Sequence, residues 1–252
     1  MRLGMYIVLC LAIGFIYFQL GTSWKDVYSR AALLFFVVAF LTFMAIAGFP
    51  AFVDEMKIYL RERLNGYYSP MVFTLSNTFA SLPFIWVIAC VSTVCVYFIA
   101  GLSNDGGDVI CGYCELYARS LADLRLLADR RSLPFAHSPS LPDFILDLFA
   151  SLTVVESLMM AIAPIVPNFL MGIAAGAGLL GVYMIVCGFF QPLGSMPQPI
   201  FRYPLSYISF HTYAFTGFMR NEFENTDGWG SPTGGNATVT GDEVLNYYGG
   251  LN

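Results

Sequence analysis

Six charged side chains are concentrated between positions 54 and 63, where the sequence reads DEMKIYLRER. A helix over these residues would place Glu55 and Glu62 on one face, two turns apart. Arg61 and Arg63 flank that face, so the segment can form an ion-paired patch on a helix surface. The simpler interpretation is a solvated helix whose positive charges only fix the orientation of the chain in a membrane.

Other residues of a reactive type are few. Cys111 and Cys114 have redox or zinc spacing, but His137 is the only further ligand nearby, and a zinc site needs more than these. Glu156 is the only charge deep in a long apolar run, where a carboxylate costs ~3 kcal/mol or becomes protonated. It either forms hydrogen bonds within a helix bundle or contacts a substrate or proton. His211 fits a hydrogen-bonding group at a gate or an interfacial aromatic residue.

Enzymatic motifs are missing from the sequence. There is no nucleophile elbow, no H-E-x-x-H sequence and no G-x-x-x-x-G-K-[ST] loop that could cradle phosphates. The sequence therefore offers no catalytic residues, and we expect no cofactor to be bound by this chain.

The composition indicates that lipid surrounds these residues. The chain has 252 residues, of which 57% are apolar and 12% charged, and its mean hydropathy is +0.66. Soluble domains carry roughly 25% charged residues, so this chain is too apolar to be dissolved in water alone. Its small net charge of −5 argues against a nucleic-acid partner.

Charge-free runs mark the expected membrane spans, because crossing ~30 Å of hydrocarbon takes about 20 apolar residues. The third run contains Pro83, where we expect a kink, and its helix should extend from about position 70 to 101. The fold class is therefore an all-α polytopic membrane helix bundle. Its five spans are predicted at residues 3–23, 31–53, 64–104, 145–163 and 168–190.

The remaining segments divide the chain further. Residues 1–190 form the predicted transmembrane domain, interrupted by a polar insert at 102–142 that contains a leucine- and charge-patterned surface helix. Residues 191–252 form a predicted external segment, first re-entrant and aromatic, then polar. Four glycines at 172, 176, 178 and 181 have the small-xxx-small spacing that lets membrane helices approach closely.

Two signals set the expected orientation. Lys57, Arg61 and Arg63 beside a span favour the cytoplasm for the charged segment. Asn236 is the acceptor of the only N-x-[ST] glycosylation sequence, which requires the tail to be external. Three crossings separate the two sites, so the signals agree. The arginines of the insert, which the same count places outside, oppose them.

The order of several short motifs resembles the G subfamily of ABC transporters, in particular the plant half-size members that export cuticular lipids. Near the charged segment these are Phe49-Pro50, Glu62-Arg63 and Gly66-Tyr67-Tyr68, followed by Leu82-Pro83. Farther along, the resemblance rests on TVVESLMMAIAPIVPNFLMGI, CGFF and FRYPLSYISF. It covers most of the chain except residues 102–140 and the end of the tail.

The resemblance implies roles for individual residues. Residues 51–65 would be the cytosolic coupling helix, with Glu55, Arg61, Glu62 and Arg63 as its functional side chains. Phe43 and Met184 would line the substrate cavity, and Phe189 and Phe190 would close it toward the exterior as an exit gate. A lipid-like substrate needs apolar walls, but each of these four side chains could equally be ordinary packing or lipid-facing bulk.

The resemblance also implies partners outside this sequence. A nucleotide-binding domain, in cis or in trans, would bind ATP and Mg²⁺; in the family it precedes residue 1, and a sixth span follows the tail. We therefore expect a fragment of a gene model or a truncated relative, with the insert as retained non-coding sequence or a lineage-specific insertion. The exporter would sit in the plasma membrane, in contact with membrane lipids, as a homodimer or a heterodimer with another G-type half-transporter. The alternatives are a non-catalytic subunit that regulates such transporters and a small channel.

Overall fold

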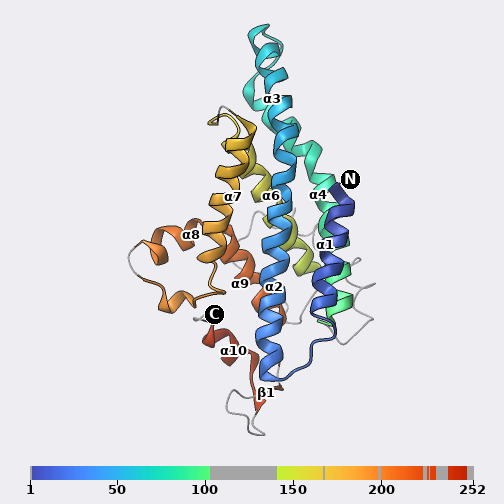
Figure 1. Ribbon diagram of the computed structural model, residues 1–252, viewed down its shortest axis with the longest axis vertical. Helices are drawn as coiled ribbons and strands as arrows, with labels where there is room; N and C mark the ends of the chain where they lie inside the picture. The colour runs from blue at the N-terminus through green and yellow to red at the C-terminus, as the bar shows by residue number, and fades with distance from the viewer. Residues whose placement is uncertain are drawn as a thin grey trace, which may run out of the picture.

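The computed structural model describes residues 2–102, 141–166, 168–197, 200–223, 226, 228–230 and 238–248 (Figure 1). Nearly all regular structure in these residues is helical, which confirms the all-α prediction. The longer helices are α1 (Arg2–Ile16), α2 (Trp24–Ala45), α3 (Phe49–Leu64), α4 (Pro70–Ala100), α6 (Leu141–Ile162), α7 (Phe169–Ile185), α9 (Phe210–Phe223) and α10 (Gly241–Tyr247). Shorter elements are η1 (Ile46–Gly48), η2 (Leu193–Ser195), the π-helical η3 (Phe201–Leu205), α8 (Ser206–Ile208), and the antiparallel strands β1 (Trp229–Gly230) and β2 (Thr238–Val239).

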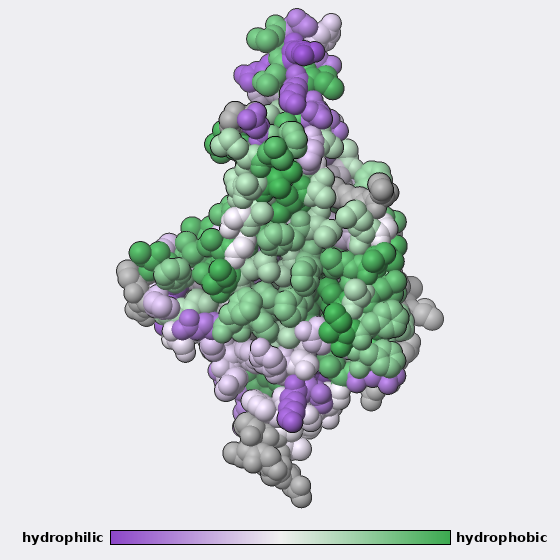
Figure 2. Space-filling model, viewed as in Figure 1, coloured by the Kyte–Doolittle hydropathy of each residue, from purple (hydrophilic) through white to green (hydrophobic). Residues whose placement is uncertain are grey.

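An apolar band separates two polar ends of the molecule. Hydrophilic residues gather around α3 at one end and near β1 and α10 at the other, with hydrophobic surface between them (Figure 2). Among the described residues, three helical stretches are long and apolar enough to cross a membrane: Trp24–Leu64, Pro70–Ala100 and Leu141–Ile162. The apolar helices Leu3–Ile16 and Phe169–Ile185 are shorter. Together these features confirm a membrane helix bundle.

The second predicted span and the charged helix form one rod. α2, η1 and α3 follow one another without a break over the 41 residues of Trp24–Leu64 (Figure 1). The rod begins seven residues before the predicted start of the span, because Ser23 caps it: the Ser23 backbone N–H donates to Asp26 Oδ2 at 3.1 Å. Charged residues therefore did not mark this boundary, and Arg30 lies inside the helix.

The first and third predicted spans pack side by side. α1 ends at Ile16, earlier than predicted, and the chain then turns through Gln19, whose φ is 47°. The N–H of Leu20 donates to the Ala100 carbonyl at 3.2 Å, which joins this turn to the end of α4. α4 covers the predicted range, contains Pro83 and stops at Gly101 in the left-handed conformation, with φ 65°.

The glycines of α7 fall into two groups. A Cβ at Gly172 would collide with the Phe49 ring, and one at Gly176 would lie 2.7 Å from Met159 Cε. Gly178 and Gly181 instead face open space. Only the first pair therefore serves the close approach that the spacing predicts.

We expect Gly172→Ala to lower the free energy of unfolding by about 1–3 kcal/mol, because the added methyl group overpacks the contact with Phe49. Gly178→Ala is the matched control on the same helix and should be neutral or slightly stabilising, since alanine favours helices. Thermal unfolding in detergent measures both. Equal midpoints for the two variants would contradict the assignment of Gly172 to a packed contact.

Candidate functional site

The predicted coupling helix is amphipathic and is held against its neighbours by aromatic rings. In α3, Tyr59 is buried and stacks on Phe73 of α4, with ring centroids 4.3 Å apart. The ring of Phe52, about two helical turns earlier on the same face, has its centroid 6.1 Å from that of the same Phe73 ring. Arg61 and Arg63 occupy the last turn, where the helix dipole favours positive charge. The charged face is thereby left toward solvent.

The four predicted residues on this helix differ in environment. Glu55, Arg61 and Arg63 are exposed, whereas Glu62 is half-buried. Glu62 accepts a hydrogen bond from the Tyr68 hydroxyl, which raises the pKa of that phenol. Glu62 therefore joins the end of α3 to the turn before α4, while the other three side chains are available to a partner.

The predicted cavity residues lie on the two predicted helices. Phe43 on α2 is half-buried against a small cluster that includes Phe49 and Leu180. Met184 on α7 is half-buried against the main core. Each keeps part of its apolar surface uncovered within this chain.

The predicted gate residues belong to a cluster of aromatic rings. Phe189 is only 8% exposed and stacks on Phe35 of α2, with centroids 4.5 Å apart and planes at 7°. It also contacts Phe190, whose ring is 5.2 Å away and 61% exposed. We call this set the aromatic gate: Tyr28, Phe35, Phe36, Phe189, Phe190 and Phe215.

The predicted span 168–190 would place Phe189 and Phe190 inside a helix, but the structure places both beyond the end of α7. α7 ends at Ile185, and Gly188 takes a φ of 100°, a conformation that favours glycine. This turn brings Phe189 back onto α2. The fifth span is therefore shorter than predicted.

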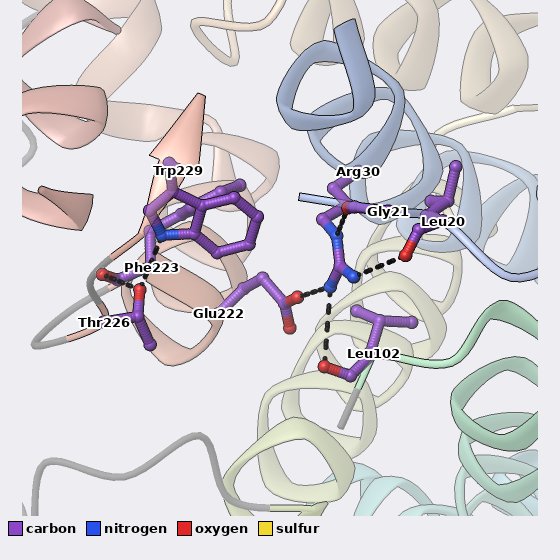
Figure 3. Close-up of polar contacts among 8 residues, drawn as sticks. All are labelled: Leu20, Gly21, Arg30, Leu102, Glu222, Phe223, Thr226 and Trp229. Atoms are coloured by element: carbon purple, nitrogen blue, oxygen red, sulfur yellow. Dashed lines mark hydrogen bonds and ion pairs between the residues drawn. The ribbon is translucent and has the colours of Figure 1, made fainter. Parts of the chain in front are cut away.

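Figure 3 shows a buried ion pair that was not predicted from the sequence. It involves Arg30, in the part of α2 farthest along the rod from α3. Arg30 of α2 pairs with Glu222 of α9, and the two side chains are 6% and 4% exposed. Arg30 Nη2 also donates to the Leu20 carbonyl at 2.8 Å. We call the set the Arg30 cluster: Arg30, Glu222, Trp229 and the carbonyl groups of Leu20, Gly21 and Leu102.

The Arg30 cluster joins α2 to four other parts of the chain. Besides α9, Arg30 binds the turn after α1 through Leu20 and Gly21, and the end of the α4 segment through Leu102 at 3.4 Å. Its guanidinium carbon lies 5.3 Å from the Trp229 ring centroid in β1. In the sequence, Arg30 directly precedes the charge-free run 31–53 and so was placed outside the predicted span, and no local signal pointed to Glu222 as its partner.

Two further polar residues lie inside the bundle. His211 is 1% exposed, and its Nε2 is 3.1 Å from Thr42 Oγ1, so it packs against α2 and is not an interfacial residue. Glu156 is half-buried on α6. On the same helix Asp147 lies against Gly217 of α9, where a Cβ would collide with its carboxylate. Glu156 is thus accompanied by a second acid within the predicted span.

Several predicted residues lie outside the described residues: Cys111, Cys114, His137, Asn236 and the helix of the polar insert. Within the ranges that the structure describes, no group of three or more His, Cys, Asp or Glu side chains could hold a metal ion.

Known proteins match this chain on both sides of the polar insert. The family model of the ABC-2 type transporter matches residues 1–117 and 137–223, with its gap inside the polar insert. ABC transporter G family member 11 of Arabidopsis thaliana is 42% identical over 88% of this chain, and member 1 of Petunia hybrida is 37% identical over 89%. Member 13 of Arabidopsis thaliana is 36% identical over 100% of the chain.

The chain spans 27%, 30% and 32% of the length of these three relatives, in the same order. Both the family match and the relatives agree with the apolar helices of the bundle. The chain therefore belongs to the ABC-2 type transporter family, as a membrane domain related to the plant G-family half-transporters.

Proposed function

We propose that this chain is the membrane-spanning part of an ATP-driven exporter of hydrophobic or lipid-like substrates such as wax or cutin precursors. It works as a homodimer or a heterodimer with another G-type half-transporter in the plasma membrane. ATP and Mg²⁺ are bound by a nucleotide-binding domain, supplied in cis or in trans. The charged face of α3 receives the motion of that domain.

The observation that carries this proposal is the continuous rod from Trp24 to Leu64. A push on the exposed charges of α3 travels along one helical body to α2, because η1 links the two helices without a loop. Phe35, on α2, stacks directly on Phe189 of the aromatic gate. A displacement of the rod thus changes the packing of Phe189, the aromatic side chain that closes the cavity toward the exterior in this proposal.

Apolar walls support a lipid-like substrate. Phe43 and Met184 both present apolar surface that this chain leaves partly uncovered, and hydrophobic ligands are bound mainly by such side chains. Two copies facing each other would bring two sets of these residues to one cavity.

Transport into inside-out vesicles tests the proposal. A transporter that contains this chain, expressed with its nucleotide-binding domain and partner, should accumulate labelled long-chain alcohols or hydroxy acids only when ATP is supplied. Accumulation without ATP would indicate a channel instead, and no accumulation of any apolar substrate would contradict the export function.

A second function, a non-catalytic subunit that binds and regulates full-length half-transporters, is favoured by the open face of α7. A Cβ added at Gly178 or Gly181 would meet no neighbouring element within 4 Å, so another helix could approach closely there. Co-purification with a full-length partner whose ATP-dependent export changes when this chain is added, while the chain itself exports nothing, would favour this function.

We expect Asn236 to be glycosylated when the protein is made in a eukaryotic cell, because β1 and α10 lie at the end of the molecule opposite α3 (Figure 1). The measurement is a mobility shift on gels after glycosidase treatment, with Asn236→Gln as the control. An unmodified tail in a correctly inserted protein would contradict the external placement.

A further inference from the structure

A cavity of about 320 Å³ lies between the start of α2 and α10. Figure 1 shows these two helices side by side at the end of the molecule opposite α3. The lining consists of Trp24, Lys25, Val27, Tyr28, Tyr247 and Tyr248. At ~30 Å³ for each water-sized group the cavity has room for about ten non-hydrogen atoms, which is the size of a head group and its first methylene groups.

The lining combines aromatic surface with one positive charge. Lys25 is exposed and is the only charged residue among the lining side chains. In the part of the chain that the structure describes, its ammonium group has no ion-pair partner. It is also one of two lysines in the whole sequence, the other being Lys57. An anion that enters the cavity would therefore meet the positive charge of Lys25.

Three tyrosines, Tyr28, Tyr247 and Tyr248, line the same cavity. Burial, and then the neighbouring phenols of Tyr28 and Tyr247, raise the pKa of Tyr248 to about 12, so the Tyr248 hydroxyl stays protonated and can donate a hydrogen bond. The Trp24 and Tyr247 rings lie edge to face at 5.6 Å and form an apolar wall. The polar and apolar parts of the lining thus match the two parts of an amphiphile.

The cavity adjoins the aromatic gate. Tyr28 lines the cavity and also stacks on Phe189, with ring centroids 5.9 Å apart. A molecule that parts Phe189 from α2 would meet Tyr28 next. Tyr28 therefore joins the cavity to the aromatic gate.

We propose that this cavity is an exit-side binding site for the carboxylate head of an amphiphile, held by Lys25 and the tyrosine hydroxyls, with its first methylene groups against Trp24 and Tyr247. This proposal rests on the proposed function, since it names the chemical class of the exported substrate. A quaternary ammonium head group is the competing ligand for aromatic rings, but Lys25 opposes it by like-charge repulsion.

The test measures equilibrium binding to the full transporter in nanodiscs of zwitterionic lipid, without ATP. Radiolabelled dodecanoate, dodecanol and dodecyltrimethylammonium are compared, and empty nanodiscs provide the blank for each. We expect dodecanoate to bind most tightly. Lys25→Gln should weaken dodecanoate binding about fivefold while leaving dodecanol unchanged, because a partly exposed charge-assisted hydrogen bond is lost.

Two further variants sharpen the result. Lys57→Gln removes the other lysine, at the α3 end, and should bind all three ligands like the unmodified protein. Lys25→Glu should reverse the preference, so that dodecyltrimethylammonium binds more tightly than dodecanoate. Lys25 is exposed, and none of these substitutions disturbs a buried contact.

Two results would overturn the proposed site. One is equal binding of dodecanoate by the unmodified protein and by Lys25→Gln, and the other is tighter binding of dodecyltrimethylammonium than of dodecanoate by the unmodified protein. ATP-dependent export by the same purified transporter, reconstituted in sealed vesicles, distinguishes failure of this site from failure of the proposed function. Export that continues with no Lys25 effect on binding refutes this site alone, whereas absence of export from the unmodified transporter refutes the proposed function.

Discussion

Arg30→Met should lower the free energy of unfolding by about 3–5 kcal/mol, because it leaves the carboxylate of Glu222 buried without its partner. The substitution also removes the donors that serve the Leu20, Gly21 and Leu102 carbonyls. Each buried carbonyl that loses its hydrogen bond adds to the cost. Unfolding of the purified protein in mixed micelles, followed by circular dichroism, measures the change.

The pairing with Glu222 can be separated from the carbonyl contacts. Glu222→Gln keeps a carbonyl oxygen that can accept from Arg30, so it should destabilise less than Arg30→Met. In the double variant Arg30→Met with Glu222→Leu, no charge remains buried, and stability should recover in part. A double variant no more stable than Arg30→Met would contradict an unpaired carboxylate as the main cause.

An exposed ion pair provides the matched control. Lys57 Nζ lies 2.9 Å from Asp54 Oδ1, and the two side chains are 62% and 73% exposed. Lys57→Met should change the unfolding free energy by no more than about 0.5 kcal/mol, since exposed pairs contribute little. A loss as large as that of Arg30→Met would show that the assay does not report on burial.

Glu62→Ala should reduce export per ATP hydrolysed by roughly 5- to 150-fold, the range that corresponds to a coupling free energy of ~1–3 kcal/mol. The physical reason is that Glu62 holds the Tyr68 hydroxyl and so connects the end of α3 to the start of α4. Without it, α3 can be displaced while α4 stays behind. ATP hydrolysis and vesicle export, measured on the same reconstituted transporter, give the ratio.

Variants of neighbouring residues identify the cause of this loss. Tyr68→Phe removes the same hydrogen bond from the other side and should lower the ratio in the same direction. Asp54→Asn, on the same helix, only weakens the exposed pair with Lys57 and should leave the ratio unchanged. If Glu62→Ala exports normally for each ATP, the coupling role of Glu62 is wrong, whatever happens to the Arg30 cluster.

Prediction from sequence succeeded where the structure depends on neighbouring residues. The start of α4 at Pro70 and its end at Gly101 follow from a proline that fits the first helical turn and a glycine that accepts a positive φ. Ser23 and Asp26 could also have located the start of α2, but Arg30 was interpreted as a boundary because a charge in an apolar segment is costly unless it is paired. The pairing residue could not be identified from the local sequence.

The positions of the gate residues likewise could not be predicted from the local sequence. The sequence placed Phe189 and Phe190 on the fifth span, since an apolar run gives no sign of where its helix stops. The structure ends α7 at Ile185, and only the contact with Phe35 explains why Phe189 turns inward while Phe190 is exposed. This contact depends on how α2 packs beside the turn after α7.

By itself, the amino-acid sequence determined that this chain is a bundle of apolar helices with a charged helix at one end, because burial in lipid and helix formation depend on composition and short-range spacing. Tertiary structure alone decided that Arg30 meets Glu222, 192 residues away along the chain, and that Phe189 stacks on Phe35. Such pairs form only after the helices have packed, so their partners are set by the geometry of the whole bundle.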